Sequence, residues 1–135
     1  MPFVQTQWWG IELPEEWAAQ AEDDTVSLVD CDELGSIDIS AIRRESGDVT
    51  RAELEALAQE TIAAGHAAQE VSLGPLTGIG FEYLEQGEYW REWYLGRGPL
   101  LLLVTYNCDA EHRDFDRPLV DDILSTITIN EEGEV

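Results

Sequence analysis

The sequence contains no lysine, and its seven arginines stand against 29 aspartates and glutamates. The formal net charge at pH 7 is therefore −22. A field of this sign repels phosphate backbones and anionic lipid head groups, so nucleic acids and membrane surfaces are not expected partners. It attracts a basic protein or a cation. Because acidic surfaces also serve solubility, the charge alone does not distinguish a recognition function from adaptation to a salty cell interior.

The chain also lacks any segment typical of export or membrane insertion. Residues 1–5 have no basic region, no apolar region and no small-residue cleavage site. The longest aliphatic run is Leu100–Val104, whereas a membrane-spanning helix needs about 20 apolar residues. We therefore expect a cytoplasmic protein in which the two cysteines, Cys31 and Cys108, are reduced thiols.

The apolar content is sufficient for a folded domain. Apolar residues make up 44% of the 135 positions and aromatic residues 9%. A chain of this length buries about 70% of its unfolded surface. With no repeat and no linker, the sequence predicts a single domain over residues 1–135, in which residues 130–135 form a flexible acidic tail.

The first third of the chain is predicted to form short strands. Pro14 ends the first strand, because proline cannot donate a hydrogen bond to a sheet, and a turn leads to Trp17. Alternation puts Ile37, Ile39 and Ala41 on one face of the third strand. The three predicted strands comprise residues 8–13, 25–29 and 36–41.

A helix is predicted from Thr50 onward. Thr50 and Glu53 have the spacing of a capping box, and Gly65 lies where a left-handed residue ends a helix. The apolar stripe that repeats with helical period consists of Leu54, Leu57, Ala58 and Ile62.

A series of strands is predicted after this helix. Gln86-Gly87 favours a tight hairpin turn. Leu100–Val104 has no alternation, which predicts a central strand that is buried on both faces. The predicted strands are residues 70–73, 78–84, 88–95 and 100–106.

The last predicted helix begins near Asp116, which is a suitable N-cap, with Pro118 in the first turn. Phe115 can close a hydrophobic staple onto its apolar face. Residues 126–129 can form a short strand. The apolar face comprises Leu119, Val120, Ile123, Leu124 and Ile127.

The predicted order is three strands, a helix, three or four strands and a helix. Because few residues separate the strands, most pairs must be antiparallel. The sequence therefore predicts an α+β fold, a largely antiparallel sheet of about six strands flanked by two main helices.

Three segments carry a resemblance to a known fold family. The opening "WWGIELPEEW" is similar to the aromatic-x-x-x-Leu-Pro-x-x-Trp start of PsbP-like proteins, and "GPLTGIGFEY" and the closing "LVDDILSTI" match the family's element order. The family includes a photosystem subunit, a Ran-binding import factor, DcrB-like lipoproteins and chaperones of secretion effectors. The resemblance spans residues 7–129 and implies the architecture. It transfers no functional residue, since function diverges widely across this fold.

The motifs of catalysis and metal binding are incomplete. Cys108 and His112 lie four positions apart but lack the further patterned ligands of a zinc site and the third group of a nucleophile pair. Residues 30–35 resemble the start of a calcium loop, but Ala41 occupies the position of its bidentate glutamate. Asp109, Glu111, Asp114 and Asp116 can hold a cation only loosely.

Phosphate-binding and hydrolase motifs are also incomplete or missing. Gly78-Ile79-Gly80 begins a dinucleotide fingerprint, but Tyr83 stands in place of the third glycine. No nucleophile elbow, HExxH motif or P-loop occurs in the sequence. We therefore expect no metal, no cofactor and no enzymatic activity.

The best candidate for a binding site is the aromatic strand at residues 88–94. Alternation puts Tyr89 and Trp93 on one face and Trp90 and Tyr94 on the other. If the helices leave one face uncovered, it forms an amphipathic binding surface with Glu82 at its rim. Alternatively, both faces belong to the core, and Arg91 pairs with a neighbouring glutamate. The predicted binding residues are Trp9, Trp90, Arg91, Glu92 and Tyr94.

These observations predict a non-enzymatic protein-binding module, chaperone-like towards another bacterial protein, that buries an apolar segment of its partner. The alternative is an acidic immunity protein or antitoxin that inhibits a basic protein, with residues 22–24 and 109–116 as contacts. A small hydrolase is a third reading, which would require a cleft with a shifted pKa. The partner and the oligomeric state are left open.

Overall fold

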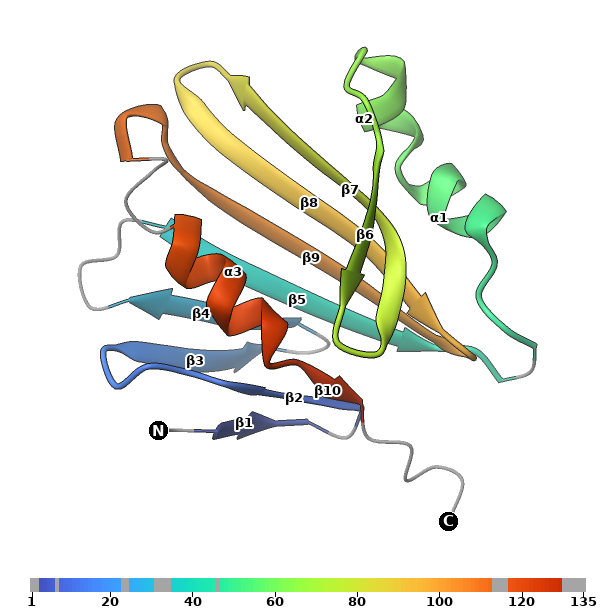
Figure 1. Ribbon diagram of the computed structural model, residues 1–135, viewed down its shortest axis with the longest axis horizontal. Helices are drawn as coiled ribbons and strands as arrows, with labels where there is room; N and C mark the ends of the chain where they lie inside the picture. Colours follow the sequence, from blue (N-terminus) through green and yellow to red (C-terminus); the bar gives the residue numbers. More distant parts are fainter. Residues whose placement is uncertain are drawn as a thin grey trace.

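A seven-stranded antiparallel sheet forms the centre of the computed structural model, which describes residues 3–6, 8–22, 25–30, 35–45, 47–112 and 117–129. The strand order is β3-β4-β5-β9-β8-β7-β6, and every neighbouring pair is antiparallel (Figure 1). The strands are β3 (Trp17–Glu22), β4 (Thr25–Asp30), β5 (Gly35–Arg43), β6 (Gln69–Leu73), β7 (Leu76–Glu85), β8 (Glu88–Arg97) and β9 (Leu100–Asp109).

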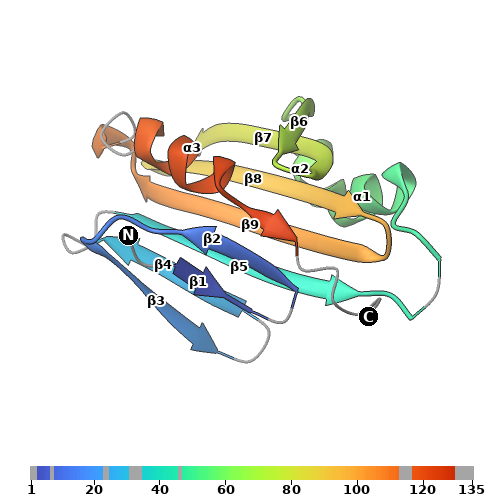
Figure 2. The same cartoon turned by 60° about the horizontal axis from the view of Figure 1, so that its bottom comes forward.

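A second, three-stranded sheet brings the two ends of the described chain together. Its central strand β2 (Trp9–Glu12) pairs with β1 (Phe3–Gln5) on one side and with β10 (Thr128–Ile129) on the other. The helix α3 (Arg117–Ser125) leads into β10. Figure 2 shows α3 and the small sheet on one side of the large sheet, away from the α1 and α2 segment (α1 Arg51–Leu57, α2 Gln59–Ala63).

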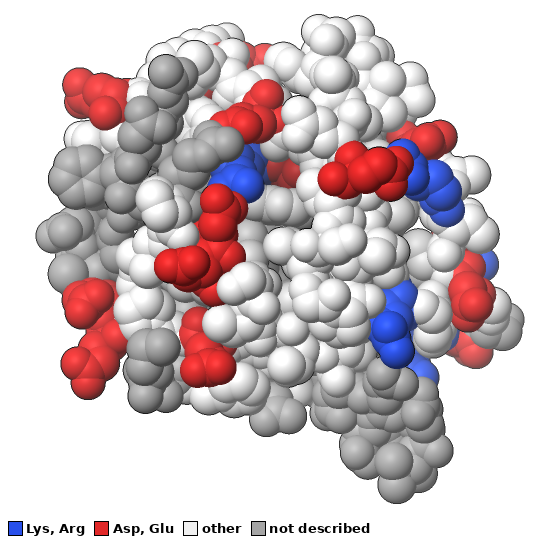
Figure 3. Space-filling model, in the orientation of Figure 1, with Lys and Arg blue, Asp and Glu red and all other residues white. Residues whose placement is uncertain are grey.

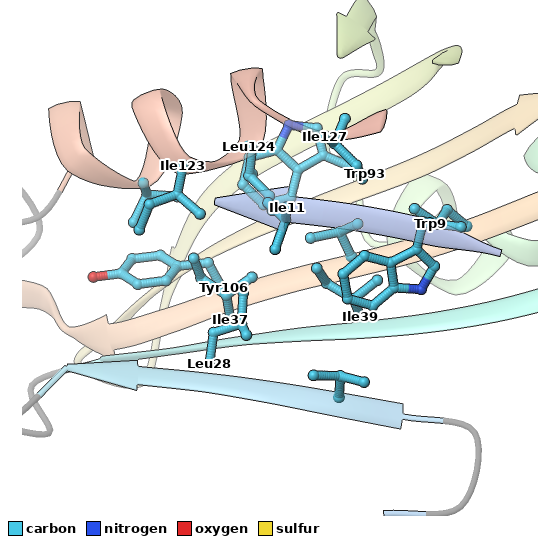
Figure 4. Packing of buried hydrophobic residues seen from close by; sticks show 14 of the residues in the cluster. Trp9, Ile11, Leu28, Ile37, Ile39, Trp93, Tyr106, Ile123, Leu124 and Ile127 are labelled. Carbon is cyan, nitrogen blue, oxygen red and sulfur yellow. The ribbon is translucent and has the colours of Figure 1, made fainter. Parts of the chain in front are cut away.

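Two hydrophobic clusters lie on opposite faces of the large sheet. The main cluster joins β2 and α3 to one face of the strands, and its side chains point toward each other in Figure 4. The second cluster joins Leu54 and Ala58 of the helical segment to Ile79, Phe81 and Leu101. Because successive side chains of a strand alternate between faces, Leu101 and Leu102 of β9 contribute to different clusters. The helices therefore lie on both sides of the sheet.

The prediction for Leu100–Val104 is confirmed. This segment lies in β9, the middle strand of the seven, and four of its residues are buried, with Leu103 half-buried. The hairpin turn before β8 is also confirmed, since Gln86 and Gly87 both have positive φ (51° and 81°), as a type I′ turn requires. This turn joins β7 to β8 as an antiparallel pair. The α+β prediction was based on such short connections between strands.

The predicted helix at Thr50 begins as expected but does not continue as one helix. Thr50 and Glu53 form the capping box, and Gly65 has a φ of 99°. The helix breaks at Ala58 into α1 and α2. Leu57 is 48% exposed and does not belong to the apolar stripe, which corrects the prediction. The rest of the stripe stays in register across the break, since Leu54, Ala58 and Ile62 all contact the second cluster.

The predicted sheet of about six strands corresponds to the seven-stranded sheet, and with the small sheet the described residues form ten strands. Residues 17–22 were not predicted as a strand, since Trp-Ala-Ala-Gln-Ala-Glu lacks β-branched residues and alternation. Six register pairs with β4 nevertheless hold it in the sheet, and Trp17 is buried. The pairing thus overrides the local preference of an alanine-rich segment.

The helix α3 and the short strand β10 after it confirm the predictions for the end of the chain. Several other predictions fall outside the described residues. They are the turn at residues 31–34, including Cys31, the Asp116 cap, the Phe115 staple, Asp114 and the tail at residues 130–135.

Candidate functional site

Part of the second face of the large sheet carries no helix within the described ranges. Helix α1 contacts β7 and β8, and its cluster extends across β9 only as far as Leu101 and Leu103. From Leu103 across the rest of this face, the side chains on β9 and β5 are half-buried. We call this surface the open face. It comprises Trp90 on β8, Leu103, Thr105 and Asn107 on β9, and Ser36, Asp38 and Ser40 on β5.

The open face is aromatic at one side and polar at the other. Trp90 lies between Tyr83 and Asn107 as cross-strand neighbours. On the polar side, Asp38 accepts a hydrogen bond from the Ser27 hydroxyl at 2.5 Å and a longer one from Ser36 at 3.5 Å. This surface offers an indole ring together with groups that can donate and accept hydrogen bonds.

The predicted division of the aromatic strand is confirmed. Tyr89 and Trp93 are 2% and 4% exposed and belong to the main cluster. Trp90 and Tyr94 lie on the other face and are half-buried. Both alternatives therefore hold in part, since Tyr89 and Trp93 are core, Tyr94 packs against the second cluster, and only Trp90 lies on the uncovered surface.

Trp9 does not belong to the site, which corrects its assignment as a binding residue. It is 1% exposed, and Figure 4 shows it pointing from β2 into the main cluster. The prediction failed because β2 is not a strand of the large sheet. It crosses the core face instead, so Trp9 fills the space between the two sheets. Trp8 is half-buried, with Arg43 stacked 5.0 Å from the ring centroid.

Arg91 is also on the opposite face, with Trp93. Its guanidinium lies 4.5 Å from the centroid of the Trp93 ring and donates to Asp121 of α3 at 2.8 Å. The expected intramolecular partner exists, but it is an aspartate on the last helix instead of a neighbouring glutamate. Glu82 faces the same side and accepts a hydrogen bond from the Tyr89 hydroxyl. Neither Arg91 nor Glu82 therefore borders the open face.

Glu92 is the centre of a hydrogen-bond network beside the open face. Its Oε1 accepts hydrogen bonds from the hydroxyls of Thr61 and Tyr94, both at 2.8 Å, and its Oε2 accepts one from Tyr83. Burial, followed by the hydrogen bond to Glu92, raises the pKa of Tyr94 to about 12. The same causes raise the pKa of Tyr83 above its ordinary value. Both phenols therefore stay protonated donors that hold the carboxylate in place.

A pocket of about 330 Å³ opens at this network. The imidazole of His66 stacks on the Tyr83 ring, with centroids 4.1 Å apart and planes inclined by 14°. Glu60 and Glu85 are exposed residues that also line the pocket, together with Thr61 and Glu92. We call it the Glu92 pocket. It combines an aromatic wall with three carboxylates.

Of the pocket residues, the sequence analysis identified only Glu92 as part of a binding site. The Gln86-Gly87 turn could have placed Tyr83, because a two-residue hairpin fixes the register of its two strands and makes Tyr83 the cross-strand neighbour of Trp90. Thr61 and His66 follow the break between α1 and α2, and no sequence pattern marks where that second segment points.

The surface charge is unevenly compensated. Arginines form ion pairs with neighbouring acids, as between Arg91 and Asp121 or Arg44 and Glu53. In Figure 3 the upper blue groups adjoin red ones, the lower blue group borders white residues, and further red groups have no blue neighbour on that face. The excess of negative charge predicted from composition is therefore displayed on the surface.

The other candidate residues lie at the end of β9, where Cys108 and Asp109 line a pocket together with Ser36 and Asn107 of the open face. Cys108 is buried at the end of β9, as expected for a structural thiol. His112 lies about 4.0 Å from Asp109 and Glu111, and ligand atoms of these three lie within 4.8 Å of one another. Cys108 does not join this exposed group. Most of the calcium-like segment, residues 31–34, lies outside the described ranges.

Across the described ranges, no helix has the length and apolar character needed to cross a membrane. No family model and no curated protein matches the sequence.

Solved structures do match. A protein from Bacteroides thetaiotaomicron is 15% identical with a TM-score of 0.64 over 93% of this chain, and the match spans only 46% of that protein. LpqN of Mycobacterium tuberculosis, involved in cell envelope biogenesis, is 15% identical with a TM-score of 0.61, over 90% of this chain and 83% of LpqN. Cyanobacterial PsbP from Synechocystis is 12% identical with a TM-score of 0.49, over 96% and 92%.

At these identities the comparison concerns the fold alone. The chain shares its fold with the Bacteroides protein and LpqN. The expected α+β architecture with a largely antiparallel sheet is confirmed. The fold assigns no activity, because unrelated functions occur on one architecture.

Proposed function

We propose that this protein is a non-enzymatic protein-binding module, chaperone-like towards another bacterial protein, and that it binds its partner on the open face. The observation that carries the proposal is the half-buried Trp90 on a sheet surface that no described helix covers. Exposed aromatic rings on an otherwise polar surface are typical of interaction sites, where tryptophan is enriched among the residues that dominate binding energy.

The chemistry of the open face indicates the kind of segment it accepts. The ring of Trp90 and the side chain of Leu103 offer apolar area, while Thr105, Asn107 and Asp38 offer hydrogen bonds. A partner segment with apolar side chains on one side and basic residues beside them complements this surface. The charge of −22 accelerates the encounter with such a segment and keeps the complex soluble.

The test is capture of the partner from a lysate of the source cells by three immobilised proteins: the natural sequence, Trp90→Ala and Leu84→Ala. Leu84 is the matched control, since it is 51% exposed on the opposite face of the sheet. The proposal predicts a partner that survives a wash at about 1 M salt, where charge interactions are screened within about 3 Å. That partner is lost from Trp90→Ala and retained by Leu84→Ala. Equal retention by all three proteins would overturn the assignment.

The alternative, an acidic inhibitor of a basic protein, is favoured by the net charge. It predicts a basic partner that the same high-salt wash removes from all three proteins, because rim carboxylates instead of Trp90 then supply the attraction. The two functions are thus separated by the salt dependence and by the effect of Trp90→Ala.

A further inference from the structure

We propose that the Glu92 pocket is the anchor site for one arginine side chain of the partner. The inference deepens the proposed function and rests on it, since the pocket lies beside the open face. Tyr83 forms a wall of the pocket and is also the cross-strand neighbour of Trp90. A segment that lies across Trp90 can therefore place one side chain in the pocket.

The shape of the pocket suits a planar cation. His66 and Tyr83 are stacked 4.1 Å apart, so they present a rigid aromatic wall beside the carboxylates. A guanidinium is flat, hydrates weakly and stacks on aromatic faces, whereas an ammonium is a compact and strongly hydrated charge. The volume of about 330 Å³ is at the small end for ligand sites, as expected for one side chain instead of an extended molecule.

The charge of the pocket also suits a cation from outside. Glu60, Glu85 and Glu92 line it, and no arginine is among the described residues that do so. Glu92 already accepts three hydroxyl hydrogen bonds, out of about four lone-pair positions of a carboxylate. It is therefore a fixed charge with one acceptor position left. The exposed Glu60 and Glu85 supply the oxygens that a guanidinium fork needs.

The three hydroxyls on Glu92 make arginine a better occupant than a metal ion. A calcium ion takes six to eight oxygen ligands and a magnesium ion demands an octahedral set. With one acceptor position left, Glu92 can offer such a set only a single oxygen. A guanidinium donates hydrogen bonds and can use the lone pair that remains, so it leaves the network intact.

The experiment uses the full chain and small probes, followed by nuclear magnetic resonance of the His66 and Tyr83 ring signals. N-acetyl-arginine amide should shift both signals with saturation in the millimolar range. N-acetyl-citrulline amide, which has the same shape without charge, should bind at least about tenfold more weakly. The lysine analogue should bind more weakly than the arginine probe. Equal effects of the arginine and citrulline probes, or no shift with either, would overturn the inference.

Paired variants test the carboxylates without disturbing the core. The double variant Glu60→Gln and Glu85→Gln changes two exposed residues and should weaken the arginine probe about tenfold. Glu15→Gln with Glu16→Gln removes the same charge at an exposed turn far along the sequence and should leave the affinity within about twofold. Equal weakening by both variants would show a general field effect and overturn a specific pocket.

The two proposals can fail separately. If Trp90→Ala abolishes capture of the partner but the arginine probe does not bind, the open face stands and the pocket inference fails. If the probe binds at the pocket but the partner is captured equally well by the Glu60 and Glu85 variant, the pocket is not the partner's anchor. If the probe binds as expected and Trp90→Ala has no effect on capture, the open-face function is the part that fails.

Discussion

Replacing Trp90 and Trp93 by alanine, one at a time, tests whether the two faces of β8 have different functions. The residues lie three positions apart on one strand, and alternation points their rings to opposite faces. Trp93 is 4% exposed within the main cluster, where Arg91 also stacks on it. Trp90 is half-buried at the open face.

The expected losses of stability follow from this difference. A fully buried tryptophan removes 150–250 Å² from water, which at about 25 cal/mol per Å² corresponds to about 4–6 kcal/mol. Truncations of buried aromatic residues cost about 3–5 kcal/mol. We therefore expect Trp93→Ala to lower the free energy of unfolding by about 4 kcal/mol. Trp90→Ala should lower it by about 1 kcal/mol, because its ring keeps part of its contact with water.

The assay is urea unfolding followed by far-ultraviolet circular dichroism, which does not depend on the tryptophan that is removed. The difference in free energy is obtained from the midpoint and the slope of each transition. A buried cavity should lower the midpoint for Trp93→Ala with the slope unchanged. Equal losses for the two variants would show that Trp90 is also core, and the open face would not exist as a binding surface.

Three further predictions concern the local structure. Thr50→Ala removes the capping hydrogen bond and should lower the free energy of unfolding by about 1 kcal/mol in urea titrations, whereas no change would show that the capping box is dispensable. Gly78→Ala puts a Cβ 1.9 Å from the Tyr94 carbonyl oxygen and should lower the free energy of unfolding by about 3 kcal/mol. Gly87→Ala, at an open turn with positive φ, should lower it by about 1 kcal/mol. Thermal denaturation compares the two variants, and a larger loss for Gly87→Ala would contradict the prediction. The pKa of Tyr94 is raised to about 12 by burial and by its hydrogen bond to Glu92. Its contribution to stability is therefore present below the unfolded pKa near 10 and lost as the pH rises through about 12, so phenolate absorbance should show a late-titrating group that Tyr94→Phe removes. An unchanged titration curve for that variant would contradict the assignment.

Much of the meander was predictable, because its signals are local. The two positive-φ residues of the Gln86-Gly87 turn fix the pairing of β7 with β8, and an uninterrupted run such as Leu100–Val104 can satisfy both faces only in a central strand. The capping box at Thr50 is likewise set by residues three positions apart.

The unpredicted features depend on contacts between distant segments. Trp9 is core because β2 pairs with β10, more than a hundred residues later, and lies against the other sheet. The Glu92 pocket depends on where the second helical segment directs Thr61 and His66. No periodicity in the sequence encodes either arrangement, since each is decided by packing between elements.

The central claim is tested most directly by photocrosslinking in cells of the source organism. A photoreactive amino acid replaces Thr105, at the centre of the open face, or Leu84, which is exposed on the opposite face. The account predicts that one protein crosslinks to position 105 and not to position 84, and that Trp90→Ala abolishes the crosslink. A crosslink of equal strength from both positions, or one that persists with Trp90→Ala, would contradict the claim that the partner binds on the open face.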